Sequence, residues 1–383
     1  MAMKALTFTD WRSIQIGEAW STSRHSPLLT MNYCFRILPV IIFVQLYALK
    51  TLGLVEWGTT SSRNAKGVVL DIDGVLYRSG IVFPRTVEAM KLLESSKIPF
   101  VFVTNGGGVT EYEKSVELTK KIGISVRPEQ VVLAHTPFCK ISQHKDQRIL
   151  VIGHEGCLDV ARSYGFSKVA SIRDIHEENP TIHPLRTPLR LPSSSERGEP
   201  IAAVLIFHDC VDWGLEMQII FDIVVGRLHK ADEDVSDIEI LKQKVPIYTS
   251  NADIVYASSH PFSRFTQGAF VEAFKSLYEL TTGEKLVVDT CGKPFKVQYD
   301  FATELLEKEN EALKQDVMTQ FYGVGDNPKS DIRGANNAGD QWTSVLVRTG
   351  VFTGPGNDAV DPADIVVGDI LDAVHFIIAD KQH

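Results

Sequence analysis

The sequence predicts an α/β fold in which helices wrap a parallel sheet. Short apolar runs rich in β-branched residues recur at 67–72, 99–103, 321–324 and 343–347, and near 365–367. Buried parallel strands have this near-continuous apolar character. Helix starts and helical patterns lie between the runs, and such an alternation is typical of a sheet built from βαβ units.

Length and composition are those of a folded soluble enzyme. The chain has 383 residues, of which 44% are hydrophobic and 23% charged, which is enough for two or three domains. The net charge of −9 argues against a nucleic-acid partner, because phosphate backbones are bound by clustered Lys and Arg. The five cysteines form no C-x-x-C pair, which predicts a reducing compartment and no zinc-finger framework.

Residues 1–66 differ from the rest of the chain. Seven basic and three acidic residues give this segment a charge of +4, which leaves −13 for the remainder. Its apolar run at 37–49 would span about 20 Å as a helix, less than the roughly 30 Å hydrocarbon core, unless it continued to residue 55. The Arg- and Ser-bearing, acid-poor composition favours a mitochondrial presequence. A membrane anchor through 37–55, or an extension on a cytoplasmic protein, stays open.

The first predicted strand delivers two carboxylates. Asp71 and Asp73 stand at the carboxyl end of the run at 67–72, and Gly74 allows a sharp turn after them. Ligands of open α/β sheets bind at the carboxyl ends of strands. Pro84 then opens a helix with its apolar face at 89–93.

The second predicted strand ends in polar and flexible residues. Thr104, Asn105 and three glycines at 106–108 follow the run at 99–103. A T-x-x-E capping box at 110–113 opens the next helix. A hydroxyl and free backbone N–H groups just past a strand end are suited to holding a phosphate.

Two further segments carry charged residues downstream. Lys293 lies in a rigid Gly-Lys-Pro turn ahead of a helix. The strand at 321–324 runs into Asp326 and Asp331, which precede a helix rich in small residues at 332–338. Here again a strand delivers an acid at its end.

In this order the motifs resemble those of the haloacid dehalogenase (HAD) superfamily. They are D-I-D-G at 71–74, T-N-G-G-G at 104–108, G-K-P at 292–294 and G-D-N-P-K-S-D at 325–331. The resemblance covers about residues 67–375. H-T-P at 135–137 and Q-G-A-F at 267–270 make the chain similar to class IIA, and within it to the mitochondrial HAD-like group named after the human cat eye syndrome critical region. The resemblance implies a Rossmann-like core with helices on both faces of its sheet and an inserted α/β class II cap.

The family's pattern implies a Mg²⁺-dependent phosphatase that works through a phosphoaspartate. Asp71 would be the nucleophile, and Asp73 would act as acid and then as base. The metal ligands would be the Asp71 carboxylate, the Asp73 main-chain carbonyl and Asp326. Asp331 would support the ion through its hydration shell.

The remaining motif residues would bind the phosphoryl group. By the same resemblance, Thr104 and the Asn105 amide would contact its oxygens, and Lys293 would neutralise charge and orient Asp71. A carboxylic acid at position 73 points to phosphate esters, because an alkoxide leaving group needs a proton and a halide does not.

The resemblance also predicts the domains. We expect an extension at 1–66, a core at 67–134 and 256–383, and a cap at 135–255. Strands at 148–152 and 201–207 support a small α/β cap, whose loops would supply substrate contacts. The candidates for these contacts are His154, Glu155, His208 and Asp209. Residues 179–200 read as a long loop, and 250–253 resemble the family's hinge.

The predicted function is hydrolysis of a small phosphate monoester. The predicted partner is a small phosphorylated metabolite, and we expect no nucleic acid; peripheral membrane association and a homodimer stay open. One alternative is a phosphatase of a glycerophospholipid-related headgroup at a membrane. Another is a catalytically silent binding or scaffold protein, against which the retention of all four motifs counts.

Overall fold

The structure of the protein, a computed structural model, describes residues 65–186, 198–228, 241–256, 260 and 262–380. The chain divides into two units, 1–62 and 63–383. The predicted presequence and the anchor through 37–55 lie outside the described residues, and so does part of the predicted loop at 179–200.

The first sheet has six parallel strands in the order β15-β14-β13-β1-β4-β5. β1 (Ala65–Leu70) pairs with β13 (Met318–Gly325) on one side and β4 (Phe100–Val103) on the other. The outer strands are β5 (Val131–Val132), β14 (Trp342–Val347) and β15 (Ile365–Val367). The apolar runs therefore form the predicted parallel sheet, and β1 begins at Ala65, two residues earlier than expected.

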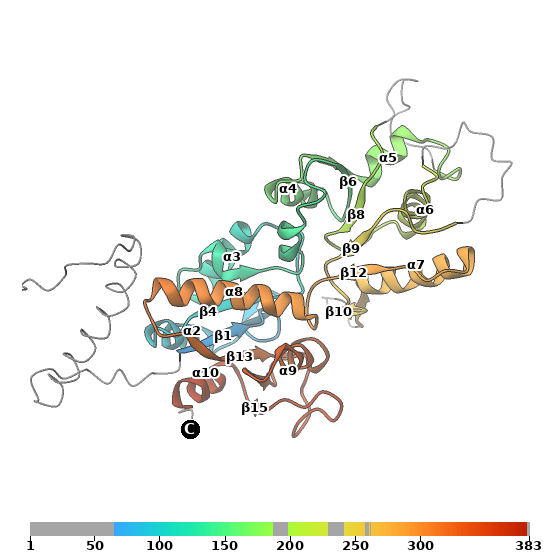
Figure 1. The fold of residues 1–383 in the computed structure, drawn as a ribbon. Coiled ribbons are helices and arrows are strands. Elements are labelled where there is room, and N and C mark those ends of the chain that lie inside the picture. Colours follow the sequence, from blue (N-terminus) through green and yellow to red (C-terminus); the bar gives the residue numbers. More distant parts are fainter. Residues whose placement is uncertain (1–64, 187–197, 229–240, 257–259, 261, 381–383) are drawn as a thin grey trace, which may run out of the picture. The chain divides into compact units, whose positions relative to one another are not determined.

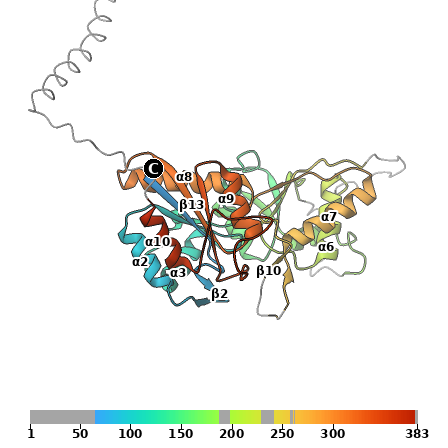
Figure 2. The same ribbon diagram turned by 90° about the horizontal axis from the view of Figure 1, so that it is seen from below.

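Helices cover both faces of this sheet. Val68 and Leu70 of β1 pack into one buried cluster with α2 (Thr86–Ser95), α3 (Glu111–Ile122) and α10 (Ile370–Ala379). Val69, which points the other way, packs with α8 (Lys296–Ala312). Figure 2 shows α2, α3 and α10 gathered on one side of the strands. The α/β class with helices on both faces is confirmed.

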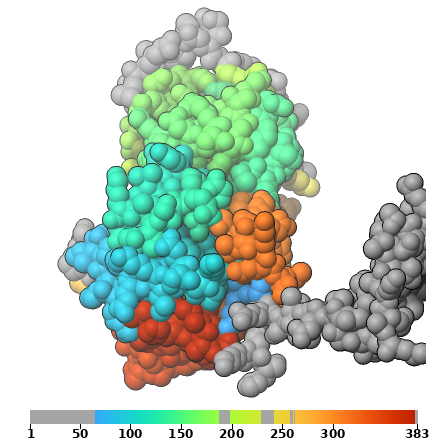
Figure 3. Space-filling view, turned by 90° about the vertical axis from the view of Figure 1, so that its left-hand side faces the viewer, coloured from blue at the N-terminus to red at the C-terminus, as the bar shows by residue number. Residues whose placement is uncertain are grey.

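Two helices of the first sheet that lie far apart in the sequence, α2 and α10, are neighbours in space. α10 contacts α2, and the red surface of the C-terminal segment adjoins the cyan surface of the segment that contains α2 (Figure 3). α9 (Arg333–Ala338) follows a single π turn (Pro328–Ile332) and packs on α8 and β14.

The second sheet has five parallel strands in the order β12-β9-β8-β6-β7 (Figure 1). Its strands are β6 (Arg148–Ile152), β7 (Lys168–Ala170), β8 (Ala203–Ile206), β9 (Ile247–Thr249) and β12 (Val288–Thr290). Its helices are α4 (Gly156–Ser163), α5 (Ile172–Glu178), α6 (Trp213–Val224) and α7 (Gln267–Thr282). Leu150 and Ile152 pack with α6 and α7, whereas Ile149 and Val151 pack with α4.

The second sheet reaches further along the chain than the insertion predicted at 135–255. β12 pairs with β9, and Phe270, Phe274 and Tyr278 of α7 are buried in the same cluster as Ile152. Residues 267–290 were expected in the core. They belong with the second sheet because the apolar face of α7 packs against buried residues of that sheet, such as Leu150 and Ile152.

The remaining elements are short. Two hairpins pair β2 (Tyr77–Arg78) with β3 (Ile81–Val82) and β10 (Val255–Tyr256) with β11 (Arg264–Phe265), and 3-10 turns occupy Pro128–Gln130 and Thr136–Lys140. In the described part of the chain, no helix combines the length and the apolar character needed to cross a membrane.

Candidate active site

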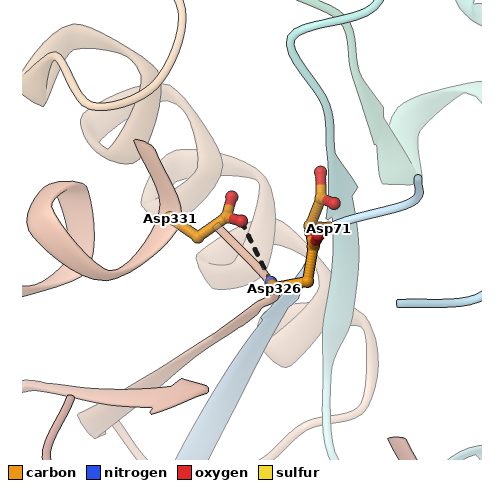
Figure 4. A group of neighbouring side chains, drawn as sticks. All are labelled: Asp71, Asp326 and Asp331. Carbon is orange, nitrogen blue, oxygen red and sulfur yellow. Dashed lines mark hydrogen bonds between the residues drawn. The ribbon is translucent and has the colours of Figure 1, made fainter. Parts of the chain in front are cut away.

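Three aspartates converge at the carboxyl ends of neighbouring strands. Asp71 follows β1 and Asp326 follows β13, and these strands are paired at Leu70 and Val324. Asp331 returns from the next turn, so that one carboxylate oxygen of each aspartate lies within 4.8 Å of the others. All three side chains are buried, and Figure 4 shows how they face one another.

Close packing fixes Asp326 and Asp331. Asp331 Oδ2 accepts hydrogen bonds from the backbone N–H groups of Asp326 (3.2 Å) and Asn327 (3.0 Å), the first of which is drawn in Figure 4. A Cβ at Gly74 would overlap the Asp326 carboxylate, and Gly74 has a φ of +92°. Only glycine therefore suits that position.

Lys293 is the cation of this cluster. Its Nζ contacts Asp71 Oδ1, lies 2.6 Å from Asp331 Oδ1 and donates to the carbonyl oxygen of Val103 at 3.0 Å. The side chain is buried. Burial alone would lower the pKa of Lys293, but the Asp331 and Asp71 carboxylates outweigh it and raise that pKa above its ordinary value. Lys293 is therefore charged and held by two aspartates.

One lysine does not balance three buried carboxylates. Burial raises the pKa of Asp71 well above its ordinary value. Burial and the neighbouring Asp331 carboxylate raise the pKa of Asp326 to about 7. Buried like charges resist ionisation unless a cation lies among them. A set of carboxylate oxygens is also what Mg²⁺ prefers, so the donor set fits a divalent cation.

Thr104 lies beside the cluster, at the end of β4. Its Oγ1 accepts the Gly106 N–H at 3.0 Å, so the hydroxyl proton can be donated to an incoming oxygen. The predicted phosphate-binding hydroxyl thus sits one strand away from Asp71, because β4 pairs with β1.

The Asn105 side chain is already engaged within the protein. Its Nδ2 donates to Asp253 Oδ2 (3.0 Å) and to the carbonyl oxygen of Lys293 (2.9 Å), and its Oδ1 accepts the Lys293 N–H at 2.7 Å. Both amide protons are used. The side chain therefore ties the Lys293 turn to the hinge segment, and a contact with phosphate would have to come from the Asn105 backbone.

Asp73 lies two residues after Asp71, in the turn that follows β1. Its side chain is exposed, yet desolvation by the surrounding protein raises its pKa, an effect that the nearby Lys114 opposes. The following turn is held by Thr349, whose hydroxyl donates to the carbonyl oxygen of Gly74 at 2.5 Å. A carboxyl group with a raised pKa that faces solvent can exchange protons, as an acid and base must.

The two segments that carry the cluster match models of known protein families. The model for haloacid dehalogenase-like hydrolases matches residues 68–167, and a HAD-hydrolase-like model matches 290–373. A mitochondrial hydrolase of Saccharomyces cerevisiae is 36% identical over 347 residues, which cover 82% of this chain and 96% of that protein. The chain belongs to the haloacid dehalogenase-like hydrolases. The expected family is confirmed.

Other relatives resemble this hydrolase in part or in fold. A cardiolipin synthase and mitochondrial hydrolase fusion protein of Schizosaccharomyces pombe is 34% identical over 304 residues, 74% of this chain and 48% of that protein. A p-nitrophenyl phosphatase from Archaeoglobus fulgidus (TM-score 0.56, 82% and 99% of the two chains) and a 4-nitrophenylphosphatase from Thermotoga maritima (0.57, 82% and 97%) are each 18% identical. These two structures share the fold.

The four cap candidates of this hydrolase separate into two pairs. A Cβ at Gly108 would collide with His154 and His208, whose ring centroids are 5.2 Å apart, so both histidines adjoin the glycine loop. Glu155 instead pairs with Arg173 at 3.1 Å on the surface. Asp209 accepts the N–H of Gln267 at 2.8 Å, at the start of α7.

Two contacts around the cluster are not anticipated from the sequence. Tyr299 is buried and donates from its hydroxyl to the carbonyl oxygen of Asp331 at 2.9 Å. Asp253 is the partner of Asn105 in the hinge. Neither contact has a local signal in the sequence, because each joins residues more than 30 positions apart.

His135, from the H-T-P motif, is completely buried, and we expect it to make the stability of the protein depend on pH. Burial lowers its pKa to about 3, whereas an unfolded histidine titrates near 6.5. The unfolded chain therefore binds the extra proton first, and stability is lost as pH falls below about 6.5. We expect protonation of His135 in the unfolded chain to lower the free energy of unfolding by about 2 kcal/mol between pH 7 and pH 5.

Urea denaturation at both pH values measures this loss. In His135→Gln, which cannot take up the proton, the loss should be smaller by the same amount. An identical pH dependence in the wild type and the variant would contradict the prediction.

Proposed function

We propose that the protein is a Mg²⁺-dependent phosphatase that hydrolyses small phosphate monoesters through a phosphorylated Asp71. The observation that carries the proposal is the position of Asp71: buried, paired with Lys293 and surrounded by Asp326 and Asp331. A carboxylate that is held in place, and whose charge is screened by Lys293 and a bound cation, can act as a nucleophile toward phosphorus. The two nitrophenyl phosphatases that share the fold support the reaction class.

The groups that would hold Mg²⁺ are the carboxylates of Asp71 and Asp326 and the main-chain carbonyl of Asp73. Asp331 would support the ion through its hydration shell. When bound, the ion would screen the negative charges of the phosphate and of the nucleophile, which otherwise repel each other. The excess of buried carboxylates over Lys293 is the support for a divalent cation here.

The chain's own residues would perform two steps. Asp71 attacks phosphorus while Asp73 gives its proton to the leaving oxygen, which departs as an alcohol. Asp73, now a carboxylate, takes a proton from water, and the water oxygen attacks the phosphoryl group and releases Asp71. Lys293 favours the ionised form of Asp71 and aligns it, and the Thr104 hydroxyl donates to a phosphoryl oxygen throughout.

A substrate panel tests this function. The full chain with Mg²⁺ should hydrolyse p-nitrophenyl phosphate, lose the activity in EDTA and regain it when Mg²⁺ is restored. A panel of phosphorylated metabolites then ranks natural substrates by kcat/KM. An absence of activity across the panel, with the protein folded and Mg²⁺ bound, would favour the silent binding protein.

The role of Asp73 is tested by varying the leaving group. Asp73→Asn should lower the hydrolysis of an alkyl phosphate by about 10²–10⁴-fold, the usual contribution of a general acid. Nitrophenolate needs no proton to leave, so the first step with p-nitrophenyl phosphate should be affected far less. Equal losses of single-turnover rate with both substrates would contradict an acid role.

We propose a mitochondrial location for the protein. The name of the yeast relative as a mitochondrial hydrolase supports it, and so does the basic, acid-poor segment at 1–66. Import of the full chain into isolated mitochondria, followed by protease protection, tests the location. Accumulation outside the organelle would contradict it.

A second candidate substrate is a lipid headgroup that ends in a phosphate monoester. The fission-yeast relative favours it, because there the hydrolase is joined to a cardiolipin synthase in one chain. Activity on such a lipid in vesicles, compared with activity on the free headgroup phosphate, distinguishes the two substrates.

A further inference from the structure

The glycine loop after Thr104 is held by His135. The N–H of Gly108 donates to His135 Nε2 at 3.1 Å, and the N–H of Ala134 donates to the carbonyl oxygen of Gly106 at 3.1 Å. A Cβ at Gly107 would lie 2.8 Å from the His135 ring. The imidazole thus packs directly against the loop and bonds to its last glycine.

The hydrogen bonds determine where each proton lies. A backbone N–H can only donate, so His135 Nε2 accepts and the ring proton lies on Nδ1. Nδ1 is 2.8 Å from the Tyr164 hydroxyl, which must accept the hydrogen bond from Nδ1–H. The Tyr164 hydroxyl in turn donates to Glu111 Oε1 at 2.5 Å. These hydrogen bonds therefore run in one direction, from the Gly108 N–H to the Glu111 carboxylate.

This series of hydrogen bonds connects elements of the two sheets. Glu111 begins α3, directly after the glycine loop of the first sheet, whereas Tyr164 ends α4 of the second sheet. Phe207, just after β8, packs against both rings, with centroid distances of 5.3 Å to His135 and 6.1 Å to Tyr164. A shift of α4 would break the bond that orients the imidazole.

We propose that His135 is a positioning residue that holds the loop at 106–108 in its phosphate-binding form, and that Tyr164 makes this form depend on the placement of α4. The inference rests on the proposed function, in which Thr104 binds the phosphoryl group, and on the sequence expectation that the glycine loop after Thr104 helps to hold it. It assigns the H-T-P motif a role in substrate affinity rather than in the chemical step.

Kinetics of matched variants test the proposal. His135→Phe keeps a buried ring but removes both hydrogen bonds, and Tyr164→Phe removes only the hydroxyl. The control is Tyr112→Phe, since Tyr112 is an exposed neighbour of Glu111 outside the chain of bonds. His135→Gln retains an oxygen that can accept from Gly108, and it should restore part of the affinity.

The proposal predicts a change in KM rather than in kcat. His135→Phe loses the hydrogen bond that holds the loop, which should weaken binding of the phosphoryl group in the ground and transition states alike. KM for p-nitrophenyl phosphate, and the inhibition constant of inorganic phosphate, should therefore rise about tenfold. Tyr164→Phe should show a smaller rise of the same kind. The double variant should bind no worse than His135→Phe alone, because Tyr164 acts through His135.

Amide hydrogen exchange supplies a readout that does not need activity. Exchange at 106–108 should be faster in His135→Phe and Tyr164→Phe than in the wild type, and unchanged in Tyr112→Phe. Additive losses of affinity, or unaltered exchange at 106–108 in folded His135→Phe, would overturn the proposal. A wild type without phosphatase activity would refute the proposed function, and exchange would still decide whether His135 holds the loop.

Discussion

Asp71→Asn should lower kcat of the phosphatase reaction by about a thousandfold or more. The amide has nearly the shape of the carboxylate but cannot attack phosphorus, so binding can persist while the first step fails. The fold should survive, because burial raises the pKa of Asp71 and a neutral side chain relieves the crowding of carboxylates. Steady-state kinetics and thermal unfolding measure the two effects.

The control for this variant is Asp289→Asn, which removes an exposed carboxylate from β12 and should leave kcat unchanged. Asp71→Asn with near wild-type kcat would contradict the nucleophile. A lost activity accompanied by a large fall in unfolding temperature would contradict the expected separation of chemistry from folding.

Lys293→Met should reduce both activity and stability. The methionine fills a similar volume but leaves the buried carboxylates of Asp71 and Asp331 without their cation. Removing one partner of a buried ion pair typically costs about 3–5 kcal/mol. We therefore expect a loss of this size in urea denaturation without Mg²⁺, together with the loss of turnover that follows from a misplaced Asp71.

The matched control is Lys296→Met, three positions away. Lys296 is exposed and pairs with Asp300 one helical turn on, and such surface pairs contribute only about 0.3–0.5 kcal/mol. If Lys293→Met were as stable as Lys296→Met, the charge of Lys293 would not be needed to hold the aspartates in place.

The sequence predicts the parts of the site that strands deliver. Asp71, Thr104 and Asp326 each follow an apolar run, and the runs become neighbouring strands β1, β4 and β13. Parallel strands bring their carboxyl ends to one edge of a sheet, so the local pattern predicts that these residues lie along that edge. That they belong to one site follows from the resemblance of the motifs to the haloacid dehalogenase family. The fold class follows from the same pattern.

Other features depend on contacts between distant residues. The Asn105 amide is taken up by Asp253 and Lys293, at separations of 148 and 188 residues. β12 is only three residues long and has an exposed Asp289 at its centre, so it lacks the apolar run of a buried strand. Its place in the sheet is set by pairing with β9, which local periodicity cannot predict.

The most direct test of the account is to trap the phosphorylated enzyme. Rapid mixing of the Mg²⁺-loaded protein with p-nitrophenyl phosphate, followed by borohydride, should reduce an aspartyl phosphate to homoserine. Mass spectrometry of the peptide that contains Asp71 should then find homoserine at position 71, and only when substrate is present. An unmodified Asp71 during active turnover, or a phosphoryl group on another residue, would contradict the proposed mechanism.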